Sequence, residues 1–379
     1  MKILLVGEYS RLHNSLKEGL VSLGHDVTIL GTGDYFKNYP VDIKLSRKYD
    51  EGLLKKLKIG IYKITGLDIT SISLKKQFFK QSDNLKGFDI VQLINESSFD
   101  VSPEVEKQFI SFLKTNNDTL FLLSCGTDHL SVKYAFGNNF RYSILNPLFD
   151  GTLSENKYSP ILKYLKPEYK SLHEFVFKSI DGVIASDIDY HIPLKGHKQY
   201  LGLISNPINV DTLKFQSLDT GGRIVIFHGI NRSNYYKKGS DYFEAALAII
   251  QKKYPDKVHI EIVEDLPYSQ YIETYNKAHI ILDQVLGYDQ GYNALEAMAK
   301  GKVVFTGAEK EFEEYYNLQK PVAINALPDE KQIADELEDL ILNPENIIEI
   351  GRNARAFIEK EHHYKTIAER YISTWTKSN

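Results

Sequence analysis

Residues 279–306 read HIILDQVLGYDQGYNALEAMAKGKVVFT, and this stretch decides the fold class. The apolar runs at 279–282 and 303–306 are each short enough to be buried strands. Between them, a glycine-containing loop leads into apolar residues with helical spacing near 293–300. A strand, a helix and a second strand in this order form the unit from which parallel sheets are built. The stretch therefore predicts an α/β protein.

The same alternation extends over the rest of the chain in two series. In the first series we expect strands at 2–6, 27–30, 89–93, 119–123 and 182–185 and helices at 73–86, 104–114 and 168–179. In the second we expect strands at 223–227, 259–263, 279–282, 303–306 and 322–324, helices at 241–252, 270–277, 293–300 and 328–342, and helical sequence from Pro344 onward. Two Rossmann-like β/α/β domains are predicted, each with helices on both faces of its sheet.

The change in composition after residue 204 predicts the domain boundaries. We expect a first domain at 1–204 and a second at 223–359, with 205–222 as a linker and hinge because it is polar and contains Ser205-Asn206-Pro207 and Gly221-Gly222. Ligands of open parallel sheets bind beyond the carboxyl ends of the strands. The two domains are therefore expected to face each other across a cleft that holds the site.

The composition excludes several classes of protein. Of the 379 residues, 42% are hydrophobic and 25% charged, which is ordinary for a globular protein. A formal net charge of -4 gives no general attraction for nucleic acid, so we expect no such partner. Cys125 is the single cysteine, and neither a secretion signal nor an apolar run long enough to cross a bilayer is visible. We expect a reduced, cytoplasmic protein.

Several nucleotide and metal motifs are excluded. The turn after the first strand, Gly7-Glu8-Tyr9-Ser10-Arg11-Leu12, lacks the three spaced glycines of a dinucleotide site. The sequence has neither a Walker phosphate loop nor a G-x-S-x-G nucleophile turn. Asp187-Ile188-Asp189 has the D-x-D pattern with which some glycosyltransferases hold a metal–diphosphate complex, but so short a pattern is common by chance. We expect no metal and no cofactor.

Two segments of the second half carry the residues for phosphate chemistry. Residues 227–240 leave a strand end and contain Arg232 and Lys238, whose charges can neutralise a diphosphate; a basic surface loop is the alternative. In residues 283–304, a helix beginning near Asn293 presents free N–H groups that can bind phosphate. Glu296 lies one turn further on, where a carboxylate can accept hydrogen bonds from ribose hydroxyls. Asn293 and Glu296 could instead form a plain capping box.

The order of these motifs resembles a known family. A strand, Asn231-Arg232, Lys238-Gly239 and a helix are followed by a strand, Asp283-Gln284, a glycine loop and the sequence ALEAMAKGK at 294–302. This pattern resembles the donor-binding half of retaining GT-B glycosyltransferases of the family 4 type. Residues 261–268 and 275–283 are also similar to that family. The resemblance covers about 202–305 specifically and the first half only in topology.

The resemblance implies a role for each matching position. Arg232 and Lys238 would bind the donor diphosphate and stabilise the charge on the leaving group without a metal. The remaining donor contacts implied are backbone N–H groups of Gly291, Tyr292 and Asn293 to phosphate, Glu296 to ribose, the loop 264–268 with Leu266 to the base, and Asp283 and Gln284 to the sugar. The family pattern has a glutamate eight positions before Glu296, where this chain has Tyr288. The family also implies that the last helix, about 360–379, crosses back onto the first domain.

In the first half, Gly7 could approach the donor phosphate at the end of the first strand. Asp128 and His129, after another strand, could contact the transferred sugar or the acceptor. For Asp128, a helix cap in an ordinary turn is the alternative.

The resemblance implies a metal-independent hexosyltransferase that moves a sugar from a UDP- or GDP-sugar to an acceptor hydroxyl with retention. The expected acceptor is a saccharide or lipid-linked saccharide in bacterial surface polysaccharide, capsule or lipopolysaccharide synthesis. A sugar-nucleotide epimerase of the same fold and a non-catalytic, nucleotide-sugar-binding partner subunit are the alternatives.

Residues 44–86 contain eleven Lys/Arg and four Asp/Glu, interleaved with apolar residues such as Leu53 and Leu57. A solvated basic surface is the interpretation that we favour. The alternative is peripheral contact with the anionic inner face of a membrane that carries a lipid-linked acceptor.

Overall fold

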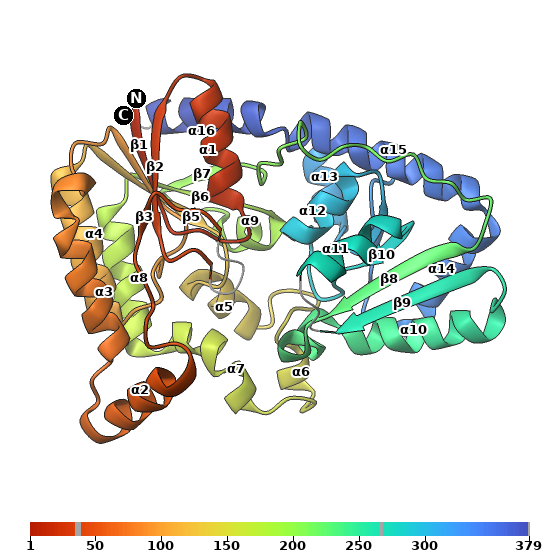
Figure 1. Ribbon diagram of the computed structural model, residues 1–379, viewed down its shortest axis with the longest axis horizontal. Helices are drawn as coiled ribbons and strands as arrows, with labels where there is room; N and C mark the ends of the chain where they lie inside the picture. Colours follow the sequence, from red (N-terminus) through yellow and green to blue (C-terminus); the bar gives the residue numbers. More distant parts are fainter. Residues whose placement is uncertain (35–38, 265–267, 378–379) are drawn as a thin grey trace. The chain divides into compact units, whose positions relative to one another are not determined.

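The computed structural model describes residues 1–34, 39–264 and 268–377, with the backbone alone for 268–272 (Figure 1). The chain forms two compact units. The first unit contains Met1–Lys133, Pro160–Pro207 and Tyr364–Asn379, and the second contains Tyr134–Ser159 and Ile208–His363.

The first unit is built on a parallel sheet of seven strands in the order β3-β2-β1-β4-β5-β6-β7. The strands are β1 (Lys2–Val6), β2 (Asp26–Gly31), β3 (Ile43–Lys44), β4 (Ile90–Leu93), β5 (Thr119–Ser124), β6 (Gly182–Ala185) and β7 (Tyr200–Leu203). The helices are α1 (Leu12–Ser22), α2 (Gly52–Thr65), α3 (Ile69–Lys80), α4 (Pro103–Asn116), α5 (His129–Phe136), α7 (Glu155–Leu162), α8 (Pro167–Ser179), α9 (Ile188–Leu194) and α16 (Tyr364–Lys377), of which α5 and α7 extend into the second unit.

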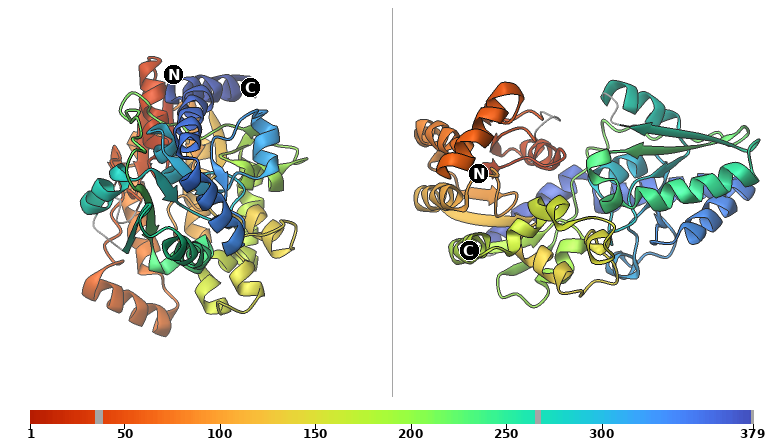
Figure 2. Two further views of the ribbon diagram at one scale, coloured as in Figure 1. Left: turned by 90° about the vertical axis from the view of Figure 1, so that its right-hand side faces the viewer. Right: turned by 90° about the horizontal axis from the view of Figure 1, so that it is seen from below.

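Helices lie on both faces of this sheet, because successive side chains of a buried strand point to opposite sides (Figures 1 and 2). Leu4 and Val6 of β1 belong to the apolar cluster that α3, α4 and α8 complete. On the other face, the ring of Phe121 lies 6.3 Å from Trp375 of α16. Helix α16 also packs closely on α1, since a Cβ on Gly19 would lie only 2.3 Å from the carbonyl oxygen of Tyr364. Glycine at position 19 therefore permits this helix contact.

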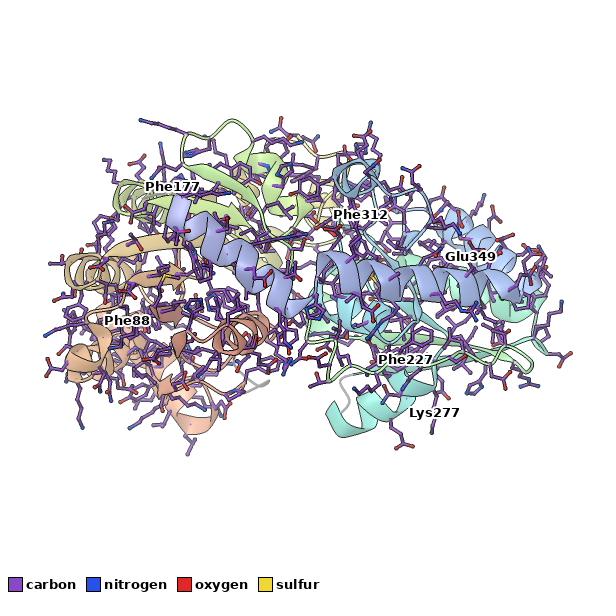
Figure 3. The ribbon with its side chains drawn as sticks, turned by 90° about the horizontal axis from the view of Figure 1, so that it is seen from above. Phe88, Phe177, Phe227, Lys277, Phe312 and Glu349 are labelled. Atoms are coloured by element: carbon purple, nitrogen blue, oxygen red, sulfur yellow. The ribbon has the colours of Figure 1, made fainter. Side chains whose placement is uncertain are left out.

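The second unit has a five-stranded parallel sheet in the order β12-β11-β10-β8-β9. Its strands are β8 (Ile224–Ile230), β9 (Val258–Glu264), β10 (Ile280–Leu282), β11 (Val303–Thr306) and β12 (Ile324–Asn325). Its helices are α6 (Asn146–Phe149), α10 (Ser240–Lys253), α11 (Tyr268–Lys277), α12 (Tyr292–Ala299), α13 (Lys310–Tyr316), α14 (Glu330–Leu342) and α15 (Pro344–Glu361). The ring of Phe312 on α13, which Figure 3 labels, packs against α15. Its centre lies 5.5 Å from that of the Phe357 ring on α15. The fold class is thus the predicted one, with two parallel α/β sheets.

Two segments group differently from the predicted domain boundaries. Residues 134–159 belong to the second unit, although the sequence prediction placed them in the first domain. Most of the predicted hinge 205–222 packs on the second unit, where Gln216 N–H donates to the carbonyl of Lys300 at 3.0 Å. The guanidinium of Arg355 on α15 also donates to the carbonyl of Leu213 at 2.6 Å. Satisfied backbone groups hold this polar segment in place, which its composition alone does not reveal.

Among the described residues, every helix is too short or too polar to cross a membrane.

Candidate functional site

Arg232 lies at the carboxyl end of β8, in a short 3₁₀ turn (Arg232–Asn234) that the side chain of Asn231 caps. Its side chain is half exposed and forms a bidentate ion pair with Glu264 at the end of the neighbouring strand β9, with Nε 2.9 Å from Oε2. The guanidinium also lies 4.8 Å from the ring centre of Tyr235. The hydrogen bond from Arg232 lowers the pKa of the Glu264 carboxyl. The adjacent strand ends thus present an exposed guanidinium with a carboxylate as its partner.

Lys238 and Asp283 meet at the ends of two neighbouring strands, β8 and β10. The ammonium of Lys238 lies 3.2 Å from Oδ1 of Asp283, and the amide of Asn293 donates to the same oxygen at 3.2 Å. The Asp283 side chain is buried, and among the described residues its Oδ2 has no hydrogen-bond partner. The Val285 N–H donates to the carbonyl of Lys238 at 2.9 Å. A Cβ on Gly239, whose φ is 70°, would lie 2.6 Å from Cβ of Val285. Glycine at 239 therefore allows the loop that follows β8 to pack directly against the loop that follows β10.

Helix α12 begins beside this pair. Gly291 is the N-cap and contributes no side chain, so the capping box of Asn293 and Glu296 is not the cap of this helix. The position for a Cβ on Gly291 is 3.7 Å from Oδ2 of Asp283 and 3.9 Å from Oε1 of Gln284. The first turn of α12 therefore starts next to the buried carboxylate of Asp283. Glu296, one turn further on, is partly buried and interacts electrostatically with Lys300.

The structure thus brings together six of the predicted donor-binding residues: Lys238, Asp283, Gln284, Gly291, Tyr292 and Asn293. The contacts of Arg232 are with Glu264 and Tyr235 instead, on the β9 side of β8. Leu266 lies outside the described residues, so the base-binding loop remains a prediction.

Tyr288, which stands where the family pattern has glutamate, is buried in the second unit. Its hydroxyl accepts a hydrogen bond from Arg141 N–H at 2.7 Å, and the Arg141 guanidinium lies 4.8 Å from the ring centre. Burial raises the pKa of the Tyr288 hydroxyl. The Tyr288 carbonyl in turn accepts from Glu309 N–H at 3.2 Å. Tyr288 therefore joins residues 134–159 to the loop that carries Glu309.

Glu309 is the centre of a polar cluster that the sequence analysis does not identify. Its carboxylate accepts hydrogen bonds from Arg141 at 2.5 Å, from the Tyr142 hydroxyl and from Asn325 at 3.1 Å. Burial raises the pKa of this carboxyl, but the three hydrogen bonds lower it by more. The partners are up to 168 residues apart in the chain, so sequence proximity offers no signal for them.

In the first unit, Gly7 directly follows β1 and has a φ of 88°, and a Cβ there would lie 2.3 Å from Cγ2 of Ile94. The next residue, Glu8, is buried and accepts two hydrogen bonds from Asn14, at 2.9 and 2.6 Å. Burial raises the pKa of Glu8 to about 7, and its Oε1 has no partner among the described residues. A carboxylate directly after a strand end is the sequence signal for this residue. The sequence analysis leaves it unassigned.

Asp128 caps helix α5, as in the structural alternative. Its Oδ1 accepts from Ser131 N–H at 2.7 Å and its Oδ2 from the Ser124 hydroxyl. The neighbouring His129 donates from Nδ1 to the carbonyl of Tyr164 at 2.7 Å, and burial lowers the pKa of its imidazole. Both predicted residues are thus buried and held by the first unit.

Asp187 has a comparable structural position. Its carboxylate caps α9 and accepts from Tyr190 N–H at 3.4 Å and from the Ser186 hydroxyl at 3.0 Å. Across the described ranges, no three His, Cys, Asp or Glu side chains gather as metal ligands.

Comparisons with known proteins agree with this architecture. Residues 228–373 match a family model described as glycosyl transferase-like. Sucrose-phosphate synthase from Thermosynechococcus elongatus superposes with a TM-score of 0.63 at 13% identity, covering 100% of this chain and 99% of that one. Anabaena HepE, solved with UDP and glucose, has a TM-score of 0.60 at 13% identity and covers 100% of both chains.

The chain has the GT-B fold. Another structural neighbour is the UDP-GlcNAc 2-epimerase of Neisseria meningitidis bound to UDP-GlcNAc, with a TM-score of 0.51 at 15% identity over 100% of both chains. No curated protein sequence matches the chain. The matched range 228–373 includes Arg232, Lys238 and Glu296, whereas Gly7, Asp128 and His129 lie before it. Residues 228–373 therefore have a glycosyl transferase-like sequence within a chain of GT-B fold.

Proposed function

We propose that the protein is a glycosyltransferase that moves a sugar from a UDP- or GDP-sugar to an acceptor hydroxyl with retention. The observation that carries the proposal is the position of Lys238 and Asp283 beside the first turn of α12. These residues lie within the range that matches glycosyl transferase-like sequences. A cation, the backbone N–H groups of a helix start and a buried carboxylate are groups that can bind a phosphorylated sugar.

The donor diphosphate would bind Lys238, Arg232 and the backbone N–H groups of Gly291, Tyr292 and Asn293. In this structure Glu264 forms an ion pair with the guanidinium of Arg232, but both side chains are about half exposed. Exposed ion pairs contribute little to stability, so a phosphate can replace this carboxylate at small cost. The two cations would then stabilise the negative charge on the leaving diphosphate, without a metal ion.

The ribose, the base and the sugar of the donor would contact other residues of the second unit. Glu296 would accept hydrogen bonds from the ribose, and the loop 264–268 with Leu266 would contact the base. Asp283 has one oxygen engaged by Lys238 and Asn293 and one oxygen without a described partner, which makes Oδ2 the natural acceptor for a sugar hydroxyl. Gln284, at the same strand end, would add a second sugar contact.

Gly7, Asp128 and His129 would act from the first unit, at the end of β1 and the start of α5. The tight approach of Gly7 to Ile94 leaves backbone rather than side chain at this strand end, which suits contact with a phosphate. Asp128 and His129 would contact the transferred sugar or the acceptor.

A nucleotide-binding screen tests the donor site. UDP, GDP, ADP and CDP are titrated, with and without EDTA, into the wild type, Arg232→Ala and Lys238→Ala. We expect one nucleotide to bind best, both variants to weaken it at least tenfold, and EDTA to have no effect. Lys237→Ala is the matched control, because the ammonium of Lys237 lies over the ring of Tyr158 at 5.1 Å. Unchanged binding in both variants would overturn the site, and loss with EDTA would overturn the metal-free scheme.

Retention is tested on the product. With the donor sugar labelled, NMR of the first product formed is expected to show the anomeric configuration of the donor. An inverted product would overturn this part of the proposal.

Sugar-nucleotide epimerisation is the second candidate, because the Neisseria meningitidis epimerase has the same fold and is bound to UDP-GlcNAc. An epimerase would convert the nucleotide sugar without an acceptor and without releasing nucleoside diphosphate. A non-catalytic partner subunit is the third candidate, since Tyr288 replaces a glutamate. It is ruled out if the purified protein turns over a donor and Glu296→Ala abolishes turnover with an unchanged melting temperature.

The proposed acceptor is a saccharide or lipid-linked saccharide of a bacterial surface polysaccharide. Release of UDP or GDP in the presence of short saccharides, with and without a lipid chain, distinguishes the two.

A further inference from the structure

Helix α2 carries an apolar stripe that points into solvent. Each of its fourteen residues is at least partly exposed. The exposed fractions reach 81% for Leu53, 52% for Leu57 and 86% for Ile64. At 3.6 residues per turn, these three side chains fall within about 40° of one another around the helix axis. Leu67, just after the helix, is also 53% exposed. The stripe therefore continues beyond the helix.

The same helix is basic throughout. Lys55, Lys56, Lys58 and Lys63 are its charged residues, and residues 52–65 contain no acidic side chain. A helix of this kind, with leucine and isoleucine on one side and lysine around them, is typical of segments that lie in the interface of a bilayer. Several apolar side chains gathered at solvent-exposed positions bring no stability to a protein that stays in water.

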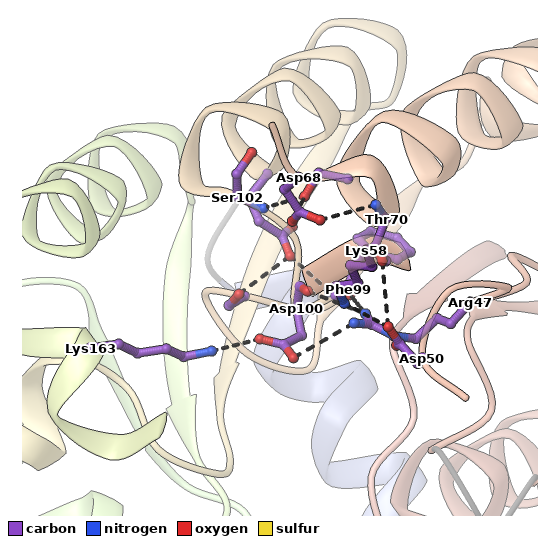
Figure 4. A network of polar contacts seen from close by, with 12 residues as sticks. Arg47, Asp50, Lys58, Asp68, Thr70, Phe99, Asp100, Ser102 and Lys163 are labelled. Carbon is purple, nitrogen blue, oxygen red and sulfur yellow. Dashed lines mark hydrogen bonds and ion pairs between the residues drawn. The ribbon is translucent and has the colours of Figure 1, made fainter. Parts of the chain in front are cut away.

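Helix α2 is attached to the rest of the first unit through Lys58 near its middle (Figure 4). Lys58, the one lysine of the helix that is mostly covered, donates to Asp50 at 2.7 Å. Asp50 also pairs with Arg47, whose guanidinium donates to the carbonyl of Phe99 at 2.6 Å. The hydrogen bonds from Lys58 and Arg47 lower the pKa of Asp50 by more than its burial raises it, so the pairs persist in mildly acidic solution. The helix is thus held on one side, with its apolar stripe turned outward.

We propose that α2 lies in the surface of an anionic lipid bilayer and holds the first unit there. Charge favours this occupant over a second copy of the chain, because two identical basic helices would repel each other. Each lysine near an anionic surface contributes roughly fivefold in affinity, and the apolar stripe adds insertion into the interface. Membrane binding by α2 does not depend on the proposed function, because it needs no transferase activity. Only the presence of a lipid-linked acceptor in that membrane rests on the proposed function.

Vesicle flotation of the full chain tests the proposal. The vesicles are phosphatidylcholine alone or phosphatidylcholine mixed equally with phosphatidylglycerol. We expect the wild type to float with the anionic vesicles only. The double variant Leu53→Asp, Ile64→Asp is expected to lose at least tenfold in vesicle affinity. The matched control is Ile249→Asp, Leu342→Asp, which makes the same change at residues that are 41% and 47% exposed on the second unit. Wild type that stays soluble with both vesicles overturns the proposal.

Two further measurements separate the possible outcomes. Trp375, the single tryptophan, is fully buried, so Leu53→Trp adds a reporter whose emission shifts to the blue when α2 enters the bilayer. Light scattering measures the mass of the wild type and of the aspartate variant. The wild type could instead be a dimer that binds no vesicles and that the aspartate variant converts to a monomer. That result would assign the apolar stripe to contact with a second copy of the chain and would overturn the membrane proposal. UDP or GDP binding in the same variant is expected to be unchanged, so this test fails independently of the donor site.

Discussion

The hydroxyl of Tyr288 accepts a hydrogen bond from the backbone N–H of Arg141 at 2.7 Å, across 147 residues of sequence. Tyr288 also lies beside the ion pairs that Arg141 forms with Glu309 and Glu311. A glutamate at 288 would place a third carboxylate next to these two. The tyrosine is therefore explained by the second unit of this chain, in which it holds residues 134–159 in place.

We expect Tyr288→Phe to lower the free energy of unfolding by about 1 kcal/mol, because Arg141 N–H loses its acceptor in a partly buried place. Tyr288→Glu is expected to cost more, since like charges gather around Glu309 and Glu311. Urea unfolding measures both. The control is Tyr62→Phe on α2, where the side chain is 59% exposed. Equal stability of Tyr288→Phe and the control would contradict the role of the hydroxyl.

The central strands were predictable because burial on both faces leaves a continuous apolar run. Thr119–Ser124 is buried at every position and is β5, close to the predicted 119–123. The edge strands β3 and β12 have only two residues each. Strand β7 is longer but only partly buried. Neither β3 nor β7 therefore leaves a continuous apolar run in the sequence. Helix α2 was missed as a helix because its apolar residues face solvent instead of a core.

The candidate site was predictable where its parts follow strand ends. Lys238, Asp283 and Gly291 all lie in loops at the carboxyl ends of adjacent strands, so topology alone brings them together. Asp128 also follows a strand in the sequence, but it lies at the start of a helix. Its carboxylate there accepts hydrogen bonds from a backbone N–H and from a hydroxyl. The contact of Tyr288 with Arg141 depends on tertiary packing and has no local pattern.

The Lys238–Asp283 pair predicts a strong coupling in a double-mutant cycle. Lys238→Ala removes a partly exposed cation from a buried carboxylate and should cost about 1 kcal/mol or more of unfolding free energy, while Lys238→Ala, Asp283→Asn should recover part of it. Thermal and urea unfolding of the four proteins gives the coupling energy. Lys277→Ala with Glu273→Gln, an exposed ion pair at 3.0 Å, is the matched cycle and should show little coupling. Additive effects of the changes at Lys238 and Asp283 would contradict an interaction between the two side chains.

Glu106 predicts a pH dependence of stability. Its carboxyl is buried on α4, and burial raises its pKa from 4.5 to about 8. Between these values the folded chain binds a proton that the unfolded chain has released, so rising pH destabilises the fold by up to about 1.4 kcal/mol per pH unit. Glu106→Gln mimics the protonated group and should become more stable relative to the wild type as pH rises from 5 to 8.

Urea unfolding at several pH values measures this difference. Glu104→Gln on the same helix, where the carboxylate is 77% exposed, is the control. A constant difference between Glu106→Gln and the wild type over this range would contradict the buried, protonated carboxyl.

Lys302, in the ALEAMAKGK stretch, is predicted to act in folding rather than in donor binding. Its side chain is fully buried, and its ammonium donates to the carbonyls of Asn276 and Ala278 at 2.8 and 2.6 Å. Lys302→Met leaves both carbonyls without this donor and should cost about 2 kcal/mol or more. Nucleotide affinity should be unchanged wherever the variant remains folded, whereas a donor-binding lysine would lose it.

The pH dependence of Lys302→Met has the opposite sign to that of Glu106→Gln. Burial lowers the pKa of Lys302 from 10.5 to about 8, so between these values the unfolded chain holds a proton that the folded chain has released. Rising pH therefore stabilises the wild type through this group. The advantage of the wild type over Lys302→Met should grow between pH 8 and 10, because the methionine cannot titrate. Urea unfolding with Lys277→Met as the exposed control measures it, and an advantage that shrinks over this range would show that the buried amine stays charged.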